Sequence, residues 1–388
     1  MRIILRRREC PDLSRGGEWL LVYGRRKVGK TTLIRQCVKH DVYMLITRTG
    51  RALLGGDAVG LGEAFREAEA VLRRGGVVVI DEFQRLPPDY LDVVSSWPRS
   101  GVLIAAGSGH SVVEDVLSRG SPLLGLLLPY KVDIIAYSDV LAQIEDPVLS
   151  AIYRDPWVIP HVDSVEDLRN KAPQLLMVAK GLIGEVFTDE RREAAETYWK
   201  ILLHVAEGRW KSTELAGLLA LRGGLASVSS MLSKLAQIGL LRGIPTLGRE
   251  KYYVVNSPAL SLVLYAEAKY GIGDTEAPPP ELPIGREIQF SVGELLAELH
   301  DAALHYSPRE DVDVVLVRGR RRVWAYEVKM GPITRREAVE AVAKLKKVAE
   351  RAGLVSLAET PPDVADASLG PRELIEAARQ IARKHGIF

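Results

Sequence analysis

The sequence has little of what marks a secreted, membrane-spanning or strongly nucleic-acid-attracting protein. Its two cysteines, Cys10 and Cys37, are too few for a disulfide framework and lack metal-site spacing, which suits a reducing cytosol. No apolar run approaches the roughly eighteen residues of a membrane span, and residues 1–20 lack a signal-peptide core, so we expect a cytoplasmic chain with no membrane contact. A net charge of +2 leaves only local patches for binding nucleic acid.

What is present is enough chain and apolar content for two or three domains: 388 residues, 47% hydrophobic and 26% charged. Over residues 19–135, short apolar runs alternate with helical stretches. The runs are Trp19–Tyr23, Val42–Ile46, Val77–Ile80, Val102–Ala106 and Val132–Ile135. Since runs that are apolar on both faces belong to strands covered on both sides, this pattern predicts an α/β fold with a parallel sheet.

A glycine-rich loop follows the first run. Residues Gly24–Thr31 match G-x-x-x-x-G-K-[ST] in full, between an apolar strand and an amphipathic stretch. Backbone N–H groups of such a loop wrap phosphates, Lys30 would contact the β- and γ-phosphates, and Thr31 would ligate Mg²⁺. The sequence therefore predicts ATP and Mg²⁺ as cofactors. The predicted nucleotide-binding residues are Gly24, Arg25, Arg26, Lys27, Val28, Gly29, Lys30, Thr31, Thr32 and Asp81.

Two acids follow the third run, at the strand end where α/β sheets place ligands. Asp81 would hold Mg²⁺ with Thr31, and Glu82 would polarise the attacking water. Ser108, after the fourth run, could sense the γ-phosphate, and its alternative is a polar turn. Glu82, Ser108 and Arg119 are the candidate catalytic residues, within a P-loop ATPase core at 1–135.

Residues 136–190 read as a helical lid, and the pattern changes again from residue 191. Helices predicted at 194–206, 213–221 (capped by Ser212) and 227–238, followed by strands at 240–243 and 251–255, make a winged helix-turn-helix plan over 191–275. The candidate DNA contacts are Ser229, Ser230, Lys234, Arg249 and Lys251. The alternative is a winged helix that contacts protein or covers the nucleotide, because a single lysine on the third helix gives little positive charge for binding DNA.

After a proline-rich linker at 278–283, residues 284–388 read as helix, strand, strand, helix, with the last helix at 335–352. Glu327 and Lys329 lie two residues apart on a predicted strand, so both point to one face. Asp313 lies on the preceding strand. The alternative to a functional site is a hairpin whose outward face carries surface ion pairs.

The chain resembles the archaeal ATPase family, P-loop proteins of the AAA-like STAND branch that carry a winged helix and often a C-terminal domain similar to PD-(D/E)xK nucleases. The residues that carry the resemblance are Arg8-Glu9, Gly24–Thr32, Ile80–Leu86, Gly107-Ser108 and Ser121–Gly125. The run around Asp313 and the run Glu327-Val328-Lys329 resemble the nuclease core. This implies a nuclease-like domain at 276–388, with Asp313 and Glu327 on Mg²⁺ and Lys329 positioning the nucleophilic water.

Two positions depart from the family pattern. Leu126 stands where the family usually has an Arg able to neutralise charge on the γ-phosphate, which implies slow or partner-activated hydrolysis, unless Arg119 substitutes. Gln289 stands where the nuclease helix usually supplies a Glu, and an amide binds Mg²⁺ less well than a carboxylate. Glu287 and Glu294 are the other acids able to approach that site.

These features predict an ATP-dependent switch linked to DNA. The alternatives are a Mg²⁺-dependent DNA nuclease and an adaptor that binds ATP without hydrolysing it. The partners expected are ATP or ADP, with DNA, a protein partner and a second copy of the chain left open.

Overall fold

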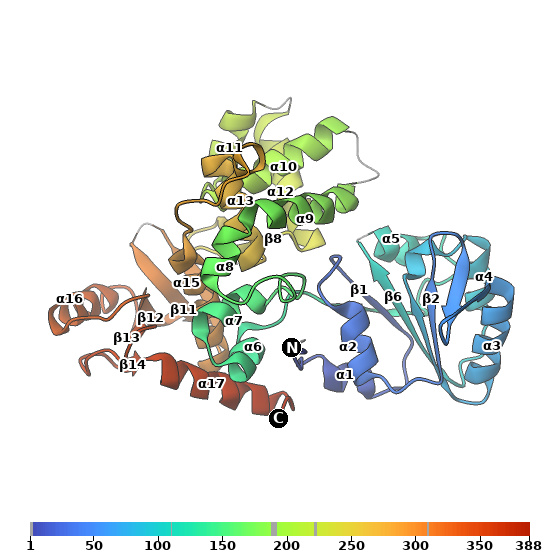
Figure 1. Ribbon diagram of the computed structural model, residues 1–388. Helices are drawn as coiled ribbons and strands as arrows, with labels where there is room; N and C mark the ends of the chain where they lie inside the picture. Colours follow the sequence, from blue (N-terminus) through green and yellow to red (C-terminus); the bar gives the residue numbers. More distant parts are fainter. Residues whose placement is uncertain (1–2, 110, 188–191, 221–222, 309) are drawn as a thin grey trace. The chain divides into compact units, whose positions relative to one another are not determined.

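The computed structural model describes residues 3–109, 111–187, 192–220, 223–308 and 310–388. The chain divides into two compact units, one of residues 9–133 and one of residues 3–8 with 134–388. Figure 1 follows the chain through both of them. The finer division of the second unit into lid, winged helix and nuclease-like domain stays a prediction.

The unit at 9–133 is built on a sheet of order β4-β3-β2-β5-β6-β1-β7. The parallel strands are β1 (Leu20–Gly24), β2 (Val42–Ile46), β5 (Val77–Asp81), β6 (Val102–Ser108) and β7 (Leu128–Lys131). An antiparallel pair, β3 (Arg51–Leu54) and β4 (Asp57–Gly60), extends the β2 edge. The mainly parallel α/β sheet predicted from the sequence is confirmed, but the β3–β4 pair was not foreseen.

The last strand of this sheet lies before the predicted run at 132–135. β7 ends at Lys131, and Val132 follows it as a fully buried residue whose amide donates to the Tyr23 carbonyl at 2.7 Å. The run at 132–135 is therefore apolar because it is buried, and its assignment as a strand was wrong. The edge strand itself, Leu-Pro-Tyr-Lys, is largely exposed and contains a proline, so it lacks the β-branched apolar character by which the other strands were predicted.

Helices cover both faces of the sheet, as Figure 1 shows for α2 and α3. Leu33 and Ile34 of α2 (Lys30–Cys37) belong to the core on one face, together with α1 (Cys10–Ser14). The other face packs against α3 (Leu61–Arg73), α4 (Asp89–Ser95) and α5 (Ser111–Leu117).

Cys10 and Cys37 are joined by a disulfide between α1 and α2. The sequence reasoning treated the two cysteines as a sign of a reducing cytosol. It missed the pairing because the folded helices bring together residues that are 27 positions apart.

The unit at 134–388 begins with helices. They are α6 (Tyr137–Ile144), α7 (Pro147–Tyr153), α8 (Val165–Asn170), α9 (Ala172–Gly184), α10 (Arg192–Ala206), α11 (Ser212–Leu219), α12 (Gly224–Ile238), α13 (Pro258–Tyr270) and α14 (Ile272–Thr275). The antiparallel strands β8 (Leu241–Pro245) and β9 (Lys251–Val255) follow α12 and form a hairpin. Lys211, and not the predicted Ser212, lies at the N-cap of α11, and α12 begins three residues earlier than predicted. Leu221, the predicted end of the second helix, lies outside the described residues.

A second sheet, of order β10-β11-β12-β13-β14, follows α15 (Ile284–Leu299). Its strands are β10 (Ala303–Ser307), β11 (Val312–Arg318), β12 (Arg321–Lys329), β13 (Arg351–Ser356) and β14 (Ala367–Leu369). The first three are antiparallel, whereas β13 and β14 run parallel to β12. One face packs against α15 and α17 (Pro371–Lys384), and the other against α16 (Arg335–Leu345).

The helix predicted at 335–352 is too long. A capping box at Thr334 and Glu337 starts α16 at the predicted place, but the helix ends at Leu345. Leu354 and Val355 are fully buried in the parallel strand β13.

Within the described residues, no single helix has both the length and the apolar character needed to cross a membrane. By length and composition alone, α11 and α12 could do so only as a pair bent by 114°.

Candidate functional site

The glycine-rich loop connects the central strand β1 to α2. Gly24 ends β1 with a φ of 158°, and a Cβ there would collide with the backbone carbonyl oxygen of Val132. Gly29 is the N-cap of α2 with a φ of 92°, a left-handed conformation that glycine adopts without strain. Both glycines of the motif are therefore required by the backbone, and the loop ends with the first N–H groups of a helix.

Lys30, the first residue of α2, is 6% exposed. Its Nζ donates to the carbonyl oxygens of Gly24 at 2.9 Å and Arg25 at 3.1 Å. Burial lowers the pKa of Lys30 to about 8, against the raising effect of Glu82 and Asp81. Phosphate oxygens are the kind of partner that would restore the charge of this ammonium group.

The magnesium-ligand candidates Thr31 and Asp81 lie in contact. The Thr31 hydroxyl donates to Asp81 Oδ2 at 2.7 Å, and the Glu82 amide donates to Asp81 Oδ1 at 2.9 Å. A hydroxyl and a carboxylate at the end of a phosphate loop are the oxygen ligands that Mg²⁺ takes in addition to phosphates and water. These residues fit the ion. The described residues hold no group of three His, Cys, Asp or Glu side chains arranged for a metal, but such a magnesium site needs fewer carboxylates.

Tyr43 is a member of the site that the sequence reasoning missed. From β2, next to β5, its hydroxyl donates to Asp81 Oδ2 at 2.5 Å, and Arg35 lies 4.6 Å from its ring centroid. Burial and the Asp81 contact raise the pKa of Tyr43, so the hydroxyl keeps its proton. The only available signal was a tyrosine within an apolar strand run.

Glu82 is held by its neighbours in a short 3-10 turn, Phe83–Arg85. Its Oε2 lies 2.9 Å from Arg85 and accepts from the Gln84 amide at 2.9 Å. The side-chain oxygen of Gln84, Oε1, accepts from the Ser108 backbone amide at 3.2 Å. Since β6 lies between β1 and β5, with Ser108 paired to Gly24, Gln84 connects the candidate catalytic acid to the strand beside the loop.

The remaining predicted residues of the loop differ in exposure. Arg25 and Val28 are buried, Arg26 and Thr31 are half-buried, and Lys27 and Thr32 are exposed. Lys27 has a φ of 66°, a left-handed conformation within the loop.

Arg119 and Leu126 are the two positions connected with the arginine that the resembled family usually has. Arg119 is exposed on the segment after α5. Leu126 packs against the core that contains Leu123 and Leu127, so its apolar side chain has a structural use. His110, next to the Ser108 turn, lies outside the described residues.

The candidate nuclease residues gather on β11, β12 and α15. Val314 pairs with Tyr326, a register that sets Asp313 opposite Glu327. Lys329 Nζ lies 2.7 Å from Glu327 Oε1. Burial, together with the charge of Glu327, raises the pKa of Asp313 to about 6, although the Val328 amide that donates to its Oδ2 at 2.8 Å opposes the shift.

Gln289 is the residue of α15 that reaches this group, through an amide that donates to the Asp313 backbone carbonyl at 2.8 Å. The two acids considered as substitutes are engaged elsewhere: Glu287 accepts from Ser261 at 2.8 Å, and Glu294 pairs with Arg154 at 2.5 Å. The side chain that α15 contributes next to Asp313 is therefore an amide and not a carboxylate.

The candidate DNA contacts are exposed. Ser229, Ser230 and Lys234 lie on α12, and Arg249 and Lys251 lie on the β8–β9 hairpin. The hairpin tip is not isolated, because Thr246 forms a parallel bridge with Tyr306 of β10 and Leu247 packs on the apolar face covered by α16.

No protein-family model matches the chain, and no curated protein matches it. Among solved structures, it is similar to the Aeropyrum pernix ORC1 protein in complex with DNA, at 16% identity and a TM-score of 0.28, over 69% of this chain and 94% of the other. It is also similar to the Aeropyrum pernix ORC2 protein in ADPNP–ADP complexes, at 13% identity and a TM-score of 0.41, over 68% of this chain and 94% of the other. For Drosophila ORC bound to DNA, the identity is 13% and the TM-score 0.23, over 66% of this chain and 83% of the other.

These TM-scores are too low to carry an argument about this chain. Its class is defined by its own features. A parallel sheet covered on both faces, with a glycine-rich loop between β1 and α2 and Asp81 at the end of β5, is consistent with a P-loop ATPase-like fold.

Proposed function

We propose that this chain binds ATP with Mg²⁺ at Gly24–Thr31 and acts as a nucleotide-dependent switch that is linked to DNA. The observation that carries the proposal is the contact of Thr31 with Asp81 at 2.7 Å beside a buried Lys30. Bound ATP would bring its β- and γ-phosphates to Lys30 and the loop amides. Mg²⁺, held through Thr31 and Asp81, would neutralise charge on those phosphates.

Glu82 is proposed to orient the attacking water. Its contacts with Arg85 and Gln84 favour a resting state in which the carboxylate is occupied, so hydrolysis requires those contacts to change. Together with Leu126 at the position where the resembled family has an Arg, this supports slow or partner-activated turnover.

Nucleotide binding to wild type and Lys30→Ala tests the proposal, with Lys39→Met, an exposed lysine beyond α2, as the matched control. We expect the control to bind as wild type does and Lys30→Ala to lose binding. Equal, negligible binding by both wild type and Lys30→Ala would remove the central claim.

Turnover separates a switch from an adaptor. Glu82→Gln should bind ATP but not hydrolyse it, and retained turnover would remove Glu82 from its role. Tight binding with no turnover by wild type, even with DNA added, favours the adaptor.

A second candidate function is Mg²⁺-dependent cleavage of DNA at Asp313, Glu327 and Lys329. The observation that favours it is the register that sets Asp313 opposite Glu327, with Lys329 2.7 Å from Glu327. Two carboxylates and an ammonium group can hold Mg²⁺ and position water for attack on a phosphodiester. Gln289 makes the site poorer in carboxylates and argues for weak metal binding.

Branched, single-stranded and duplex DNA incubated with Mg²⁺ or Mn²⁺ would decide this candidate. Cleavage that Asp313→Ala abolishes supports it. No cleavage, or cleavage that this substitution leaves unchanged, refutes it.

A further inference from the structure

A cavity of about 500 Å³ lies between the tip of the β8–β9 hairpin and the edge of the second sheet, and we call it the wing–sheet pocket. Its walls come from Trp210–Lys211, Thr246–Glu250, Tyr306–Pro308, Glu310 and Arg322. Small-molecule sites occupy roughly 300–1,000 Å³, so a pocket of this size suits one nucleotide and not a duplex.

Two aromatic rings that line the pocket, those of Trp210 and Tyr306, pack against other aromatic rings on the side away from the cavity. Tyr252 lies 5.1 Å from Trp210 and 4.2 Å from Tyr306 between ring centroids, and Phe290 lies 5.7 Å from Tyr252. Trp210 and Tyr306 also line the pocket. Rings that are packed on one side and accessible on the other are the surfaces on which unpaired bases stack.

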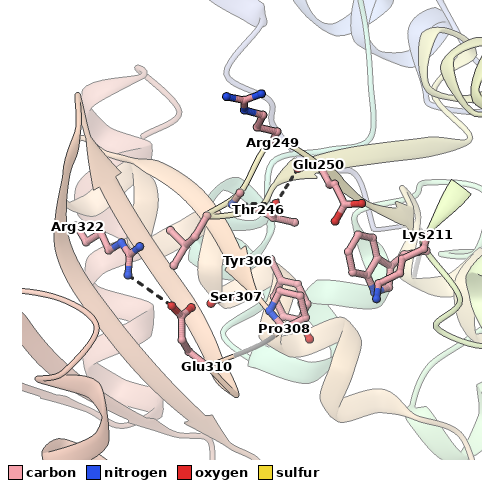
Figure 2. A pocket seen from close by; sticks show the side chains of 12 residues that line it. Lys211, Thr246, Arg249, Glu250, Tyr306, Ser307, Pro308, Glu310 and Arg322 are labelled. Atoms are coloured by element: carbon pink, nitrogen blue, oxygen red, sulfur yellow. Dashed lines mark hydrogen bonds and ion pairs between the residues drawn. The ribbon is translucent and has the colours of Figure 1, made fainter. Parts of the chain in front are cut away.

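The charged side chains that line the pocket do not all point into it. Figure 2 shows the Glu250 carboxylate pointing towards Tyr306 and Lys211, whereas Arg249 points away. Lys211 Nζ lies 5.4 Å from the Trp210 ring, and Arg322 pairs with Glu310 at 3.6 Å. A carboxylate beside the stacking surface can accept from the exocyclic amino group of a base, and a lysine at its rim can contact a phosphate.

The hairpin tip that carries Glu250 is held in place. Thr246 Oγ1 donates to the Glu250 carbonyl at 2.8 Å and accepts from the Gly248 amide at 3.2 Å. Thr246 also forms the bridge to Tyr306. The backbone of Glu250 and the aromatic wall are therefore joined through one residue, so the backbone of this side of the pocket is preformed.

The pocket adjoins the candidate nuclease group. Tyr306 lies on β10, the strand paired with β11, and Ser307 pairs with Val312, the residue before Asp313. The charge of Asp313 helps burial to raise the pKa of Tyr306, which agrees with this closeness. A strand with a base in the pocket would have its neighbouring phosphodiesters near Asp313.

We propose that the wing–sheet pocket binds an unpaired, amino-bearing base of a nucleic-acid strand, with the base on Trp210 and Tyr306, its amino group on Glu250, and a phosphate on Lys211. The proposal deepens the proposed link to DNA, on which it rests, and gives it a place other than α12. Cytosine, adenine and guanine carry an exocyclic amino group, whereas thymine does not.

The test is fluorescence anisotropy with labelled oligonucleotides of twelve cytidines or twelve thymidines, in EDTA and without ATP so that neither hydrolysis nor cleavage takes part. We expect tighter binding of deoxycytidine than thymidine strands, by roughly fivefold for one amino–carboxylate hydrogen bond. Glu250→Gln should bring the ratio towards one, and Glu376→Gln, an exposed control on α17, should leave it unchanged. A wild-type ratio of one overturns the base assignment.

The phosphate contact has its own readout. Lys211→Met should reduce the slope of log affinity against log salt by about 0.7, the value for one phosphate of a single strand. Lys384→Met, an exposed control on α17, should not change the slope. A loss of strand binding on Lys234→Met with none on Lys211→Met would place the strand on α12 and overturn the proposal.

Two further arms separate the sources of the base and the neighbouring sites. Ribocytidine strands that bind as tightly as deoxycytidine strands support a pocket that accepts RNA as well as DNA. Free cytidine monophosphate that binds while strands do not overturns the proposal. Strand binding is measured in EDTA and without ATP, so failure of ATP binding or of cleavage in their own assays is distinguishable from failure of the pocket.

Discussion

Raising the pH from 7.5 to 9.5 should weaken ATP binding through Lys30. In the protein without nucleotide, burial lowers the pKa of Lys30 to about 8, and the ammonium donates to the Gly24 and Arg25 carbonyls. Phosphates would raise this pKa, so the bound state keeps the proton. Below pH 8 the lysine is already charged, and above pH 8 binding must include the uptake of a proton.

The size of the effect follows from the two protonation equilibria. Lys30 is about three-quarters protonated at pH 7.5 and about 3% protonated at pH 9.5. The affinity should therefore fall about 25-fold between these values, which corresponds to about 2 kcal/mol. The terminal phosphate of ATP is ionised throughout this range, so its own titration contributes little.

Isothermal titration calorimetry in two buffers of different ionisation enthalpy measures both the affinity and the proton uptake. We expect uptake of about one proton per ATP at pH 9.5 and about a quarter of a proton at pH 7.5. Lys39→Met should reproduce both values. An affinity that is the same at both pH values, with no proton uptake at pH 9.5, would refute the role given to Lys30.

Three further predictions concern the unit at 134–388 and can be read in denaturant unfolding. Arg8→Met should destabilise the protein by about 3–5 kcal/mol, because it leaves the fully buried Asp139 carboxylate without the cation 2.6 Å away; a loss below 1 kcal/mol would contradict this. Gly353→Ala should cost about 1–3 kcal/mol, since the added methyl would overlap the Tyr326 ring on the paired strand, and an unchanged midpoint would show that β12 and β13 pack differently. Asp313 has a folded-state pKa raised to about 6 against an ordinary value near 4, so the folded state binds the extra proton and the stability it brings is lost as pH rises from about 4 to 6. Relative to Asp313→Asn, wild type should therefore lose up to about 3 kcal/mol between pH 4 and 7, and a constant difference would be the contrary result.

The part of the nucleotide site that could be predicted from the sequence is the part set by residue type and local spacing. The glycines and Lys30 follow from the geometry of a strand–loop–helix connection, and Asp81 follows from an apolar run that ends in acids. Tyr43 and Gln84 could not be found in this way. Tyr43 reaches Asp81 only because β2 lies beside β5, and Gln84 joins Glu82 to Ser108 only because β6 is the next strand.

The same distinction holds for the fold. The predicted bounds of α15 match the structure, since its apolar period is continuous between Pro283 and the loop at residue 300. The predictions failed where a buried apolar run did not have the secondary structure that its pattern indicated. Val132 is buried without belonging to a strand, and the helix predicted at 335–352 extended past Leu345 into Arg351 and Ala352, the first residues of the parallel strand β13.

The most direct test of the central claim is a structure determined with Mg²⁺ and a non-hydrolysable ATP analogue. We expect Lys30 Nζ to leave the Gly24 and Arg25 carbonyls for the β- and γ-phosphates, and Thr31 to turn from Asp81 to the metal. A nucleotide bound elsewhere, or a loop that keeps Lys30 on those two carbonyls with the analogue present, would contradict it.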